Sequence, residues 1–368
     1  MSQTIINGDS LEELKRIKPD TIDAVITDPP YGIAFLGKDW DSFRATKVAR
    51  SQVVKNLGTG MRMTTHTENV NYQQWCEQWG RECLRVLKPG GYLLAFSAAR
   101  LYHRITAGLE DAGFEIRDQI MWLYASGFPK AQDIGKAMAK RGVTNTWHGW
   151  KTALKPAHEP ICMARKPFKG STIDNVQKHG VGALNIDATR IPFEDAKDQK
   201  SSNGFDTKYD ALDRTGGPTF QKDKPQAGRR TASFSFGDKE THAGGDGSPE
   251  FVANDKGRFP SNVLGEVEGY QKFFYCPKVS RRERHRGTDN NHPTVKPVEL
   301  MKYLIRLVAP EGAHIVDPFS GSGSTGMACK ELGNKFTGID LDRRYCDIAR
   351  KRIQATATDP GETLRDRT

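Results

Sequence analysis

The feature that most constrains the fold is a regular alternation of short apolar runs and helical patterns at both ends of the chain. Near the start, apolar runs at 4–8 and 23–31 flank a predicted helix over 10–18. Near the end, the runs 313–319 and 335–340 are followed by helical patterns. This alternation is typical of an α/β fold, in which helices cover both faces of a mostly parallel sheet.

Apolar residues at three- and four-residue spacing mark the longer helices. The clearest covers 71–88, where one stripe contains Tyr72, Trp75, Trp79, Cys83 and Val86. Ser10 is the expected cap of the first helix. Further helices are predicted over 101–111, 298–308, 343–354 and from the turn at 321–326 to Leu332, and further strands over 92–97, within 115–124 and over 159–165.

Length and composition limit the class of protein. The chain has 368 residues, of which 36% are hydrophobic, so a large core is possible and a disordered chain or a small disulfide scaffold is excluded. The 55 basic and 45 acidic side chains leave a formal charge of +10, which favours a polyanionic partner or an anionic membrane surface. The sequence has no membrane-spanning run, signal-peptide pattern or paired cysteine spacing. We therefore expect a cytoplasmic protein without a metal site.

The middle of the chain lacks this periodicity. Residues 166–260 are rich in Gly, Ser, Thr, Asp and Lys, and the stretch 197–258 contains eleven basic and ten acidic side chains. Such a stretch is typical of a loop-rich insertion, a small β-rich module or a partly disordered segment. We predict one domain built from 1–165 and 290–355, interrupted by an insertion over 166–289 and followed by a polar tail over 356–368.

The first motif with chemical content is Asp28-Pro29-Pro30-Tyr31, which follows the apolar run AVIT. Ligands of open parallel sheets bind outside the carboxyl ends of the strands, so the motif is expected at the ligand crevice. Two prolines fix the backbone and remove two donors, which leaves the Pro29 carbonyl as an oriented acceptor. A carboxylate, a carbonyl and an aromatic ring suit a planar ligand that carries an amino group. A simple proline turn capped by Asp28 is the alternative.

The second motif is the run VDPFSGSGSTG over 316–326, in which Gly321, Gly323 and Gly326 satisfy the GxGxxG pattern between a strand and a helix. This pattern indicates a nucleotide-type cofactor but is weak alone. No Lys-Ser or Lys-Thr follows, which excludes a P-loop. A dinucleotide fold stays open, because Asp340 ends the next strand and can accept from ribose hydroxyls. Asp317 argues against a pyrophosphate and favours a cationic amino-acid group.

Together these motifs resemble those of the amino-group DNA methyltransferases that use S-adenosylmethionine. The tetrad precedes the glycine loop, which resembles the family's beta-type, circularly permuted arrangement. The segments IINGD, NHPTVKP and FTGIDLDRRYCDIARKRI complete the resemblance. It implies a Rossmann-like fold with a mostly parallel seven-stranded sheet, and a target-recognition role for the insertion. It also implies a restriction–modification setting, although not whether a cognate restriction enzyme exists.

The resemblance assigns roles residue by residue. Asp28, Pro29, Pro30 and Tyr31 are the catalytic tetrad, Asp340 holds the ribose and Asp9 the adenine edge of the cofactor. The segment 291–297 contacts the methionine end of the cofactor. The other residues implied to bind the cofactor are His292, Thr294, Lys296, Asp317, Phe319, Ser320, Gly321, Ser322 and Gly323.

The implied reaction is direct transfer of the sulfonium methyl to an exocyclic amine of a base flipped out of duplex DNA. Adenine N6 is preferred because the tetrad begins with Asp, whereas relatives that act on cytosine N4 more often have Ser. The alternatives are cytosine N4, an RNA or protein-glutamine methyltransferase, and a DNA-binding protein with a relic cofactor site. Cys276-Pro277 has the reverse order of the Pro-Cys nucleophile of cytosine carbon-5 enzymes. Relatives often form dimers, and the sequence leaves a homodimer open.

A compact basic segment over 278–286 carries five basic residues and one acidic residue. It is predicted to contact DNA phosphates, with a solvated charged stretch as the alternative. The polar segment 38–70 is predicted to be a mobile loop that closes on DNA and cofactor, or an inert one. The predicted DNA contacts are Lys278, Arg281, Arg282, Arg284 and Arg286.

Overall fold

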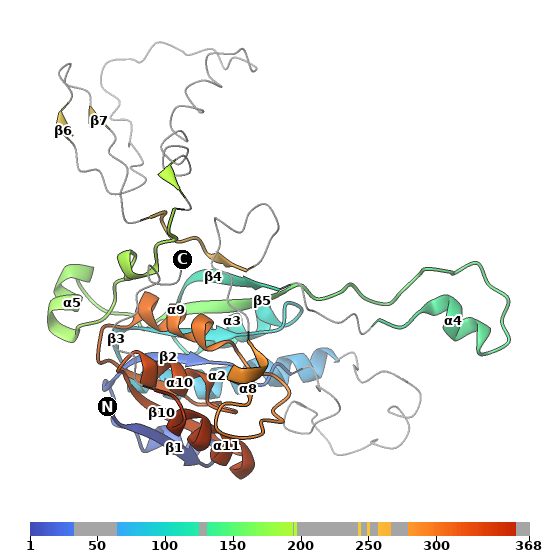
Figure 1. The fold of residues 1–368 in the computed structure, drawn as a ribbon, viewed down its shortest axis with the longest axis horizontal. Helices are drawn as coiled ribbons and strands as arrows, with labels where there is room; N and C mark the ends of the chain where they lie inside the picture. Colours follow the sequence, from blue (N-terminus) through green and yellow to red (C-terminus); the bar gives the residue numbers. More distant parts are fainter. Residues whose placement is uncertain are drawn as a thin grey trace.

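The chain folds into a three-layer α/β/α structure around one large sheet (Figure 1). The structure is a computed structural model. It describes residues 1–32, 65–124, 131–193, 195–196, 242–243, 249–250, 257–265 and 279–357.

The sheet has eight strands in the order β1-β10-β9-β2-β3-β5-β4-β8. Neighbours from β1 to β3 run parallel, β5 is antiparallel to both β3 and β4, and β8 is parallel to β4. The strands are β1 (Gln3–Asn7), β2 (Ile22–Thr27), β3 (Leu87–Phe96), β4 (Glu115–Leu123), β5 (His158–Arg165), β8 (Val263–Leu264), β9 (His314–Asp317) and β10 (Lys335–Asp340). All six residues of β2 are buried, as expected for a central strand covered on both faces.

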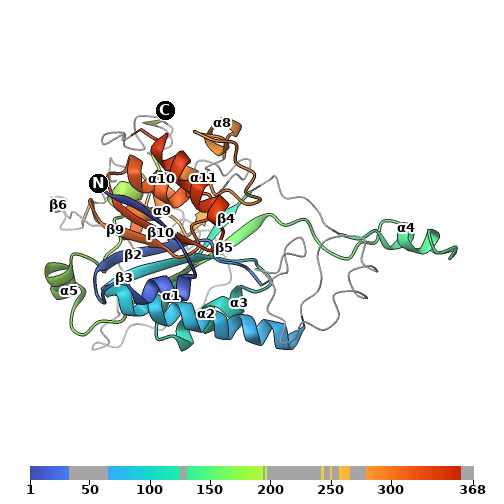
Figure 2. The same ribbon diagram turned by 90° about the horizontal axis from the view of Figure 1, so that it is seen from below.

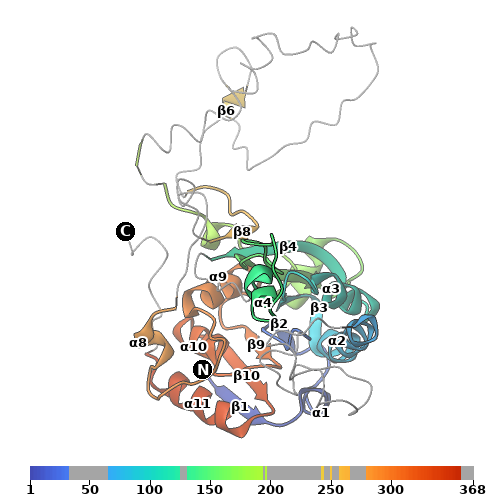
Figure 3. The same ribbon diagram turned by 90° about the vertical axis from the view of Figure 1, so that its right-hand side faces the viewer.

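Helices cover the two faces of the sheet as separate groups (Figure 2). On one face α1 (Ser10–Lys15), α2 (His66–Val86) and α3 (Tyr102–Asp111) enclose a core that includes Trp79. On the other face α9 (Val298–Val308), α10 (Ser324–Glu331) and α11 (Arg343–Gln354) enclose a core that includes Phe336. Viewed along the strands, the two groups lie on opposite sides of the sheet (Figure 3). The predicted α/β fold and mostly parallel sheet are confirmed.

The eighth strand corrects the predicted seven. Residues 263–264 pair with Met121–Trp122 at the open edge of β4. A two-residue strand has no alternation to detect in the sequence, and it covers an edge that would otherwise expose unpaired backbone groups. The cap of α1 is a second correction, because Asp9 rather than Ser10 accepts the backbone N–H groups of Leu11 and Glu12.

Helix α2 begins five residues before its predicted start at residue 71. Thr65 and Glu68 form a capping box, a signal that is present in the sequence. Strand β3 begins at Leu87, five residues before the predicted strand 92–97, and so includes Pro89, Gly90 and Gly91; its register against β2 is irregular. Of the predicted mobile loop 38–70, residues 65–70 are therefore the cap and first turn of α2, and residues 38–64 lie outside the described residues.

Part of the predicted insertion packs on the main domain. Helix α5 (Thr172–His179) contacts β3 through Asn175, whose Nδ2 donates to the Pro89 carbonyl at 3.0 Å. The 3-10 helix η4 (Asp187–Thr189) lies against α9, and Ile191 bridges to Arg258. The short strands β6 (His242–Ala243) and β7 (Pro249–Glu250) pair with each other. None of the helices in the described ranges has both the length and the apolar character to cross a membrane.

Candidate functional site

The two sequence motifs meet at the carboxyl edge of the sheet. Asp28 follows β2 directly, and Asp317 ends the neighbouring strand β9. The hydroxyl of Thr27, the last residue of β2, donates to Asp317 Oδ1 at 2.8 Å. The tetrad and the glycine loop are thus joined by a buried hydrogen bond between residues 290 positions apart.

The Asp28 carboxylate lies in a network of polar side chains from three parts of the chain. Tyr31 donates from its hydroxyl to Asp28 Oδ1 at 2.6 Å and lies 3.0 Å from Glu159 Oε2. The Lys296 ammonium pairs with Asp28 Oδ2 and lies 3.2 Å from Glu159 Oε2. It is also 4.9 Å from the centre of the Phe96 ring, a distance that favours a cation–π interaction.

Burial and the neighbouring charges shift the pKa values of the side chains in this network. Lys296 is only 6% exposed. Burial lowers the pKa of Lys296, but the adjacent carboxylates of Asp28 and Glu159 more than offset this effect, so its pKa lies above the usual value. Burial and the same carboxylates raise the pKa of Tyr31 well above its usual value, which keeps its hydroxyl neutral. With both carboxylates ionised, the network carries one net negative charge.

Glu159 was not predicted as a site residue. It is the second residue of β5, whose antiparallel direction brings the start of the strand to the edge where β2 ends. Only the pairing order of the sheet places it beside Asp28, 131 positions away in the sequence. Lys296 was predicted to contact the cofactor; its ammonium lies on Asp28 and Glu159, and the cofactor contact stays a prediction.

Asp317 accepts hydrogen bonds from residues on both sides of the glycine loop. Its Oδ1 also accepts the Phe319 N–H at 3.1 Å, and its Oδ2 accepts the Thr325 hydroxyl at 2.7 Å. Burial raises the pKa of Asp317 to about 7, although these hydrogen bonds favour the ionised form. Both oxygens are therefore occupied within the fold, and the predicted contact with a cationic ligand group stays a prediction.

The glycine loop needs glycine for both conformation and space. Gly321 and Gly323 have φ of +50° and +81°, which side chains with a Cβ rarely adopt. A Cβ on Gly321 would lie 2.9 Å from His292 Nε2, and one on Gly323 would lie 2.8 Å from Ala349 Cβ. The predicted loop and the predicted segment 291–297 are therefore in close contact.

Asp340 closes the loop from the end of β10. Its Oδ2 accepts the Gly321 N–H at 2.8 Å, and its Oδ1 accepts the Asp342 N–H at 2.8 Å. Burial raises the pKa of Asp340. Asp9 lies two residues after the end of the adjacent strand β1, where its carboxylate caps α1.

His292 and Thr294 form a turn against the loop. His292 Nδ1 lies 2.8 Å from the Thr294 carbonyl, and its ring packs edge-on against Tyr345 with centroids 4.4 Å apart. Burial lowers the pKa of His292 to about 4, so the imidazole is neutral at neutral pH. Phe319 points to the other side of the loop and packs against Trp75 and Trp79.

Arg352 supports the loop from α11 and was not predicted. Its fully buried guanidinium donates to the carbonyl of Ser322 at 2.6 Å and to its hydroxyl at 3.0 Å. Burial lowers the pKa of Arg352 to about 10, which still leaves it charged. The carbonyl and hydroxyl of Ser322 are thus engaged within the fold, and its predicted contact with the cofactor stays a prediction.

Three buried polar atoms beside the loop lack a hydrogen-bond partner among the described residues: Ser320 Oγ, Ser324 Oγ and Asn290 Nδ2. Buried polar groups are almost always hydrogen-bonded, so such atoms fit a polar ligand. Together with the loop glycines and Asp340, they suit a nucleoside carrying an amino-acid group. Within the described part of the chain, no His, Cys, Asp and Glu side chains are grouped as metal ligands.

Two arginines of the predicted basic segment have partners within the fold, and the predicted DNA contacts of the segment stay predictions. Arg284 donates to the His292 carbonyl at 2.9 Å, and Arg286 pairs with Glu331 at 2.9 Å. Arg281 and Arg282 of α8 (Arg281–Arg284) are exposed. Lys278 lies outside the described residues, as does Cys276.

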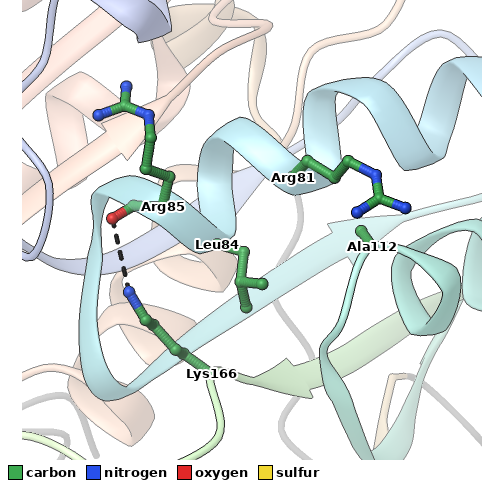
Figure 4. A pocket seen from close by; sticks show the side chains of 5 residues that line it. All are labelled: Arg81, Leu84, Arg85, Ala112 and Lys166. Atoms are coloured by element: carbon green, nitrogen blue, oxygen red, sulfur yellow. Dashed lines mark hydrogen bonds between the residues drawn. The ribbon is translucent and has the colours of Figure 1, made fainter.

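A hollow of about 240 Å³ lies at the opposite edge of the sheet, where the parallel strands begin (Figure 4). Its cations are already paired: Lys166 with Asp20, Arg81 with Glu77 and Arg85 with Glu82. It therefore offers no free charge for a ligand among the described residues that line it. The residues lining it are Arg81, Leu84, Arg85, Ala112 and Lys166.

Comparisons with known proteins show that the chain is similar to DNA methyltransferases. A family profile described as DNA methylase, for N6 and N4 enzymes, matches residues 22–351. The chain is 28% identical to the type II methyltransferase M.HindIII of Haemophilus influenzae, over 96% of each protein. It is 26% identical to the type II methyltransferase M.HpaI of Haemophilus parainfluenzae, over 96% of this chain and 75% of that protein.

Among solved structures, the PvuII DNA methyltransferase (cytosine-N4-specific) aligns with a TM-score of 0.49 and 16% identity, covering 96% of this chain and 86% of that one. The M1.HpyAVI complex with SAM aligns with a TM-score of 0.45 and 18% identity, covering 96% and 99%.

Proposed function

The chain belongs to the N6/N4 DNA methylase family, and we propose that it transfers a methyl group from S-adenosylmethionine to the N6 amino group of adenine in duplex DNA. It is an amino-group DNA methyltransferase of the restriction–modification type, as its tetrad and glycine loop predicted. The finer assignment, to adenine, is our proposal. The observation that supports the proposed function is the position of the Asp28 carboxylate. It lies at the carboxyl edge of the sheet, paired with Lys296, and the preceding residue Thr27 is hydrogen-bonded to Asp317 of the glycine loop motif.

S-adenosylmethionine supplies an electrophilic methyl group, so the protein needs to position the acceptor rather than to form a covalent intermediate. The residues proposed to hold the cofactor are those that surround the loop. Asp340 ends β10 and Asp9 follows the neighbouring strand β1, and they are proposed to lie on the ribose and adenine side. The Ser320 hydroxyl and the Asn290 amide, which have no hydrogen-bond partner among the described residues, lie at the loop. His292 and Thr294 close the opposite side.

The acceptor amine is proposed to donate hydrogen bonds to the Asp28 carboxylate and the Pro29 carbonyl. A base amine is a poor nucleophile, because its lone pair is delocalised into the ring. Two acceptors favour a pyramidal nitrogen with a localised lone pair, and the ring of Tyr31 stacks on the base. The amine is inaccessible in a stacked duplex, so the target base is flipped into the site.

The surrounding charges suit the product of transfer. The nitrogen becomes cationic as the methyl group arrives, and a part-buried network with one net negative charge stabilises a developing positive charge. In this arrangement Lys296 and Glu159 are positioning residues: the ammonium holds one Asp28 oxygen, and Glu159 holds both the ammonium and the Tyr31 hydroxyl. Asp28 then receives the proton that leaves the methylated amine.

Cytosine N4 is the second candidate, since it presents the same kind of amine to the same acceptors. The Asp at the first tetrad position supports adenine through the resemblance stated above. We also propose that the insertion 166–289 recognises the target sequence, and that the exposed Arg281 and Arg282 contact DNA phosphates.

The test is methyl transfer from radiolabelled S-adenosylmethionine to duplex DNA by the full chain and by the Asp28→Ala variant. We expect incorporation with the wild type and none above background with the variant, while calorimetry gives the same S-adenosylmethionine affinity for both. Incorporation by Asp28→Ala at the wild-type rate would overturn the assignment. Incorporation of the methyl group into RNA but not into duplex DNA would show that RNA, rather than DNA, is the substrate.

A further inference from the structure

The connection between β4 and β5 forms an arm that projects from the carboxyl edge of the sheet (Figures 1 and 2). Its described part, residues 131–157, contains α4 (Ile134–Ala139) and is held together by its own backbone. Ile134 N–H donates to the Trp150 carbonyl at 2.9 Å, and Asp133 bridges to Lys151. The arm is therefore a defined element, but it lies outside both helical layers.

The arm exposes a pair of tryptophans. Trp147 is 45% and Trp150 60% exposed, and their rings pack edge-on with centroids 5.0 Å apart. Tryptophan is normally largely buried, so two adjacent indoles on a projecting element indicate a binding surface. Neither ring belongs to the two apolar cores of the domain.

The arm is also strongly basic. Over residues 131–157 the sequence has five basic side chains and one acidic one, Asp133. All five cations are exposed. They are Lys136, Lys140, Arg141, Lys151 and Lys155. This excess equals that of the segment 278–286, where the structure engages two of the arginines within the fold.

The base of the arm adjoins the proposed catalytic site. The Tyr124 N–H donates to the Ala157 carbonyl at 2.9 Å, which closes the arm two residues before Glu159. Trp122 and Tyr124 pack against each other at this base, and Trp122 packs against Phe96, the ring beneath the Lys296 ammonium. A duplex whose flipped base reaches Asp28 therefore has its neighbouring backbone on the side from which the arm extends.

We propose that residues 131–157 are a second DNA-contacting element, separate from the predicted insertion, which binds the duplex beside the flipped base. Cations and aromatic rings together suit nucleic acid: lysine and arginine neutralise phosphates, and indoles stack on bases or pack on sugars. This inference rests on the proposed function, because it assumes that DNA reaches Asp28. A second copy of the chain is a poorer occupant, since two arms with the same excess of cations repel each other.

The experiment compares three variants of the full chain on a duplex that extends about two helical turns beyond the methylated base on each side. The aromatic variant is Trp147→Ala/Trp150→Ala, and the charge variant is Lys136→Gln/Lys140→Gln/Arg141→Gln. The matched control is Lys18→Gln/Lys335→Gln, which removes exposed cations from the opposite edge of the sheet, near the starts of β2 and β10 and outside the predicted insertion. Fluorescence anisotropy gives DNA affinity over a series of salt concentrations, and calorimetry gives S-adenosylmethionine affinity.

We expect the aromatic variant to bind DNA about tenfold or more weakly. We expect the charge variant to lower the slope of log affinity against log salt by about 2 to 3, because each lost phosphate contact contributes about 0.9. Both should keep wild-type affinity for S-adenosylmethionine, and the control should match the wild type in every measurement.

DNA affinity and salt slope equal to wild type in both arm variants would overturn the inference, provided that the wild type methylates DNA. An altered sedimentation coefficient of the free protein with unchanged DNA affinity would overturn it too, in favour of a second copy. If the wild type itself transfers no methyl group to DNA, the proposed function is wrong. Failure of the proposed function is thereby distinguished from failure of the inference about the arm.

Discussion

Replacing Glu159 by Gln keeps the shape of the side chain and removes its charge, so the network around Asp28 changes from one net negative charge to neutral. The Tyr31 hydroxyl lies 2.6 Å from Asp28 Oδ1 and 3.0 Å from Glu159 Oε2, so these oxygens are at most about 5.6 Å apart. An amine hydrogen-bonded to Asp28 then lies within about 8.5 Å of Glu159. At an effective dielectric constant of about 20, this charge stabilises the developing cation by about 2 kcal/mol.

The expected result is a rate of methyl transfer about 30-fold lower in Glu159→Gln, measured in single turnovers at saturating S-adenosylmethionine and DNA. The S-adenosylmethionine affinity should not change. In the wild type, the Asp28 and Glu159 carboxylates offset the lowering of the Lys296 pKa by burial. With only one carboxylate left, the pKa of Lys296 is lower than in the wild type. The alkaline loss of activity should therefore begin at a lower pH than in the wild type, an effect that a merely structural role would not produce.

Glu115→Gln is the matched control. Glu115 begins β4 on the same sheet and pairs with Arg165 at 2.6 Å, but it lies at the edge opposite the tetrad. We expect its transfer rate to equal that of the wild type. A Glu159→Gln rate within twofold of the wild type, or a loss no larger than that of the control, would refute the electrostatic reasoning.

Three further predictions test the surroundings. Lys296→Met should destabilise the fold by about 3 kcal/mol in urea unfolding, because it leaves two part-buried carboxylates without their cation, and adding Glu159→Gln should restore part of the loss. Gly321→Ala and Gly333→Ala both place Ala at positive φ, but calorimetry should find weaker S-adenosylmethionine binding only for Gly321→Ala, whose Cβ meets His292. Unfolding of Asp317→Asn at several pH values should give a stability that rises relative to wild type between about pH 4 and 7, since the ionised carboxyl is disfavoured in the fold, and a constant difference would contradict the raised pKa.

The regular parts of the fold could be predicted because their signals are local. The predicted helices over 298–308 and 343–354 coincide with α9 and α11, and the strand over 335–340 coincides with β10. The edge strand β8 could not be predicted, because two residues have no periodicity. The start of α2 could have been found from the capping box of Thr65 and Glu68.

The candidate site divides in the same way. Asp28 and the loop glycines belong to short motifs with a recognisable spacing, so sequence alone indicated them. Glu159 and Arg352 are single charged residues whose neighbours are set by strand order and helix packing, and no local pattern distinguishes them. The arm gives little sequence signal, because the helix in its described part has only six residues and its tryptophans follow no apolar stripe.

The most direct test of the central claim is the identity of the modified nucleoside. Duplex DNA is incubated with S-adenosylmethionine and either the wild type or Asp28→Ala, digested to nucleosides and measured by mass spectrometry. The account predicts N6-methyladenine with the wild type and none with the variant. N4-methylcytosine without N6-methyladenine, or N6-methyladenine formed equally well by Asp28→Ala, would contradict it.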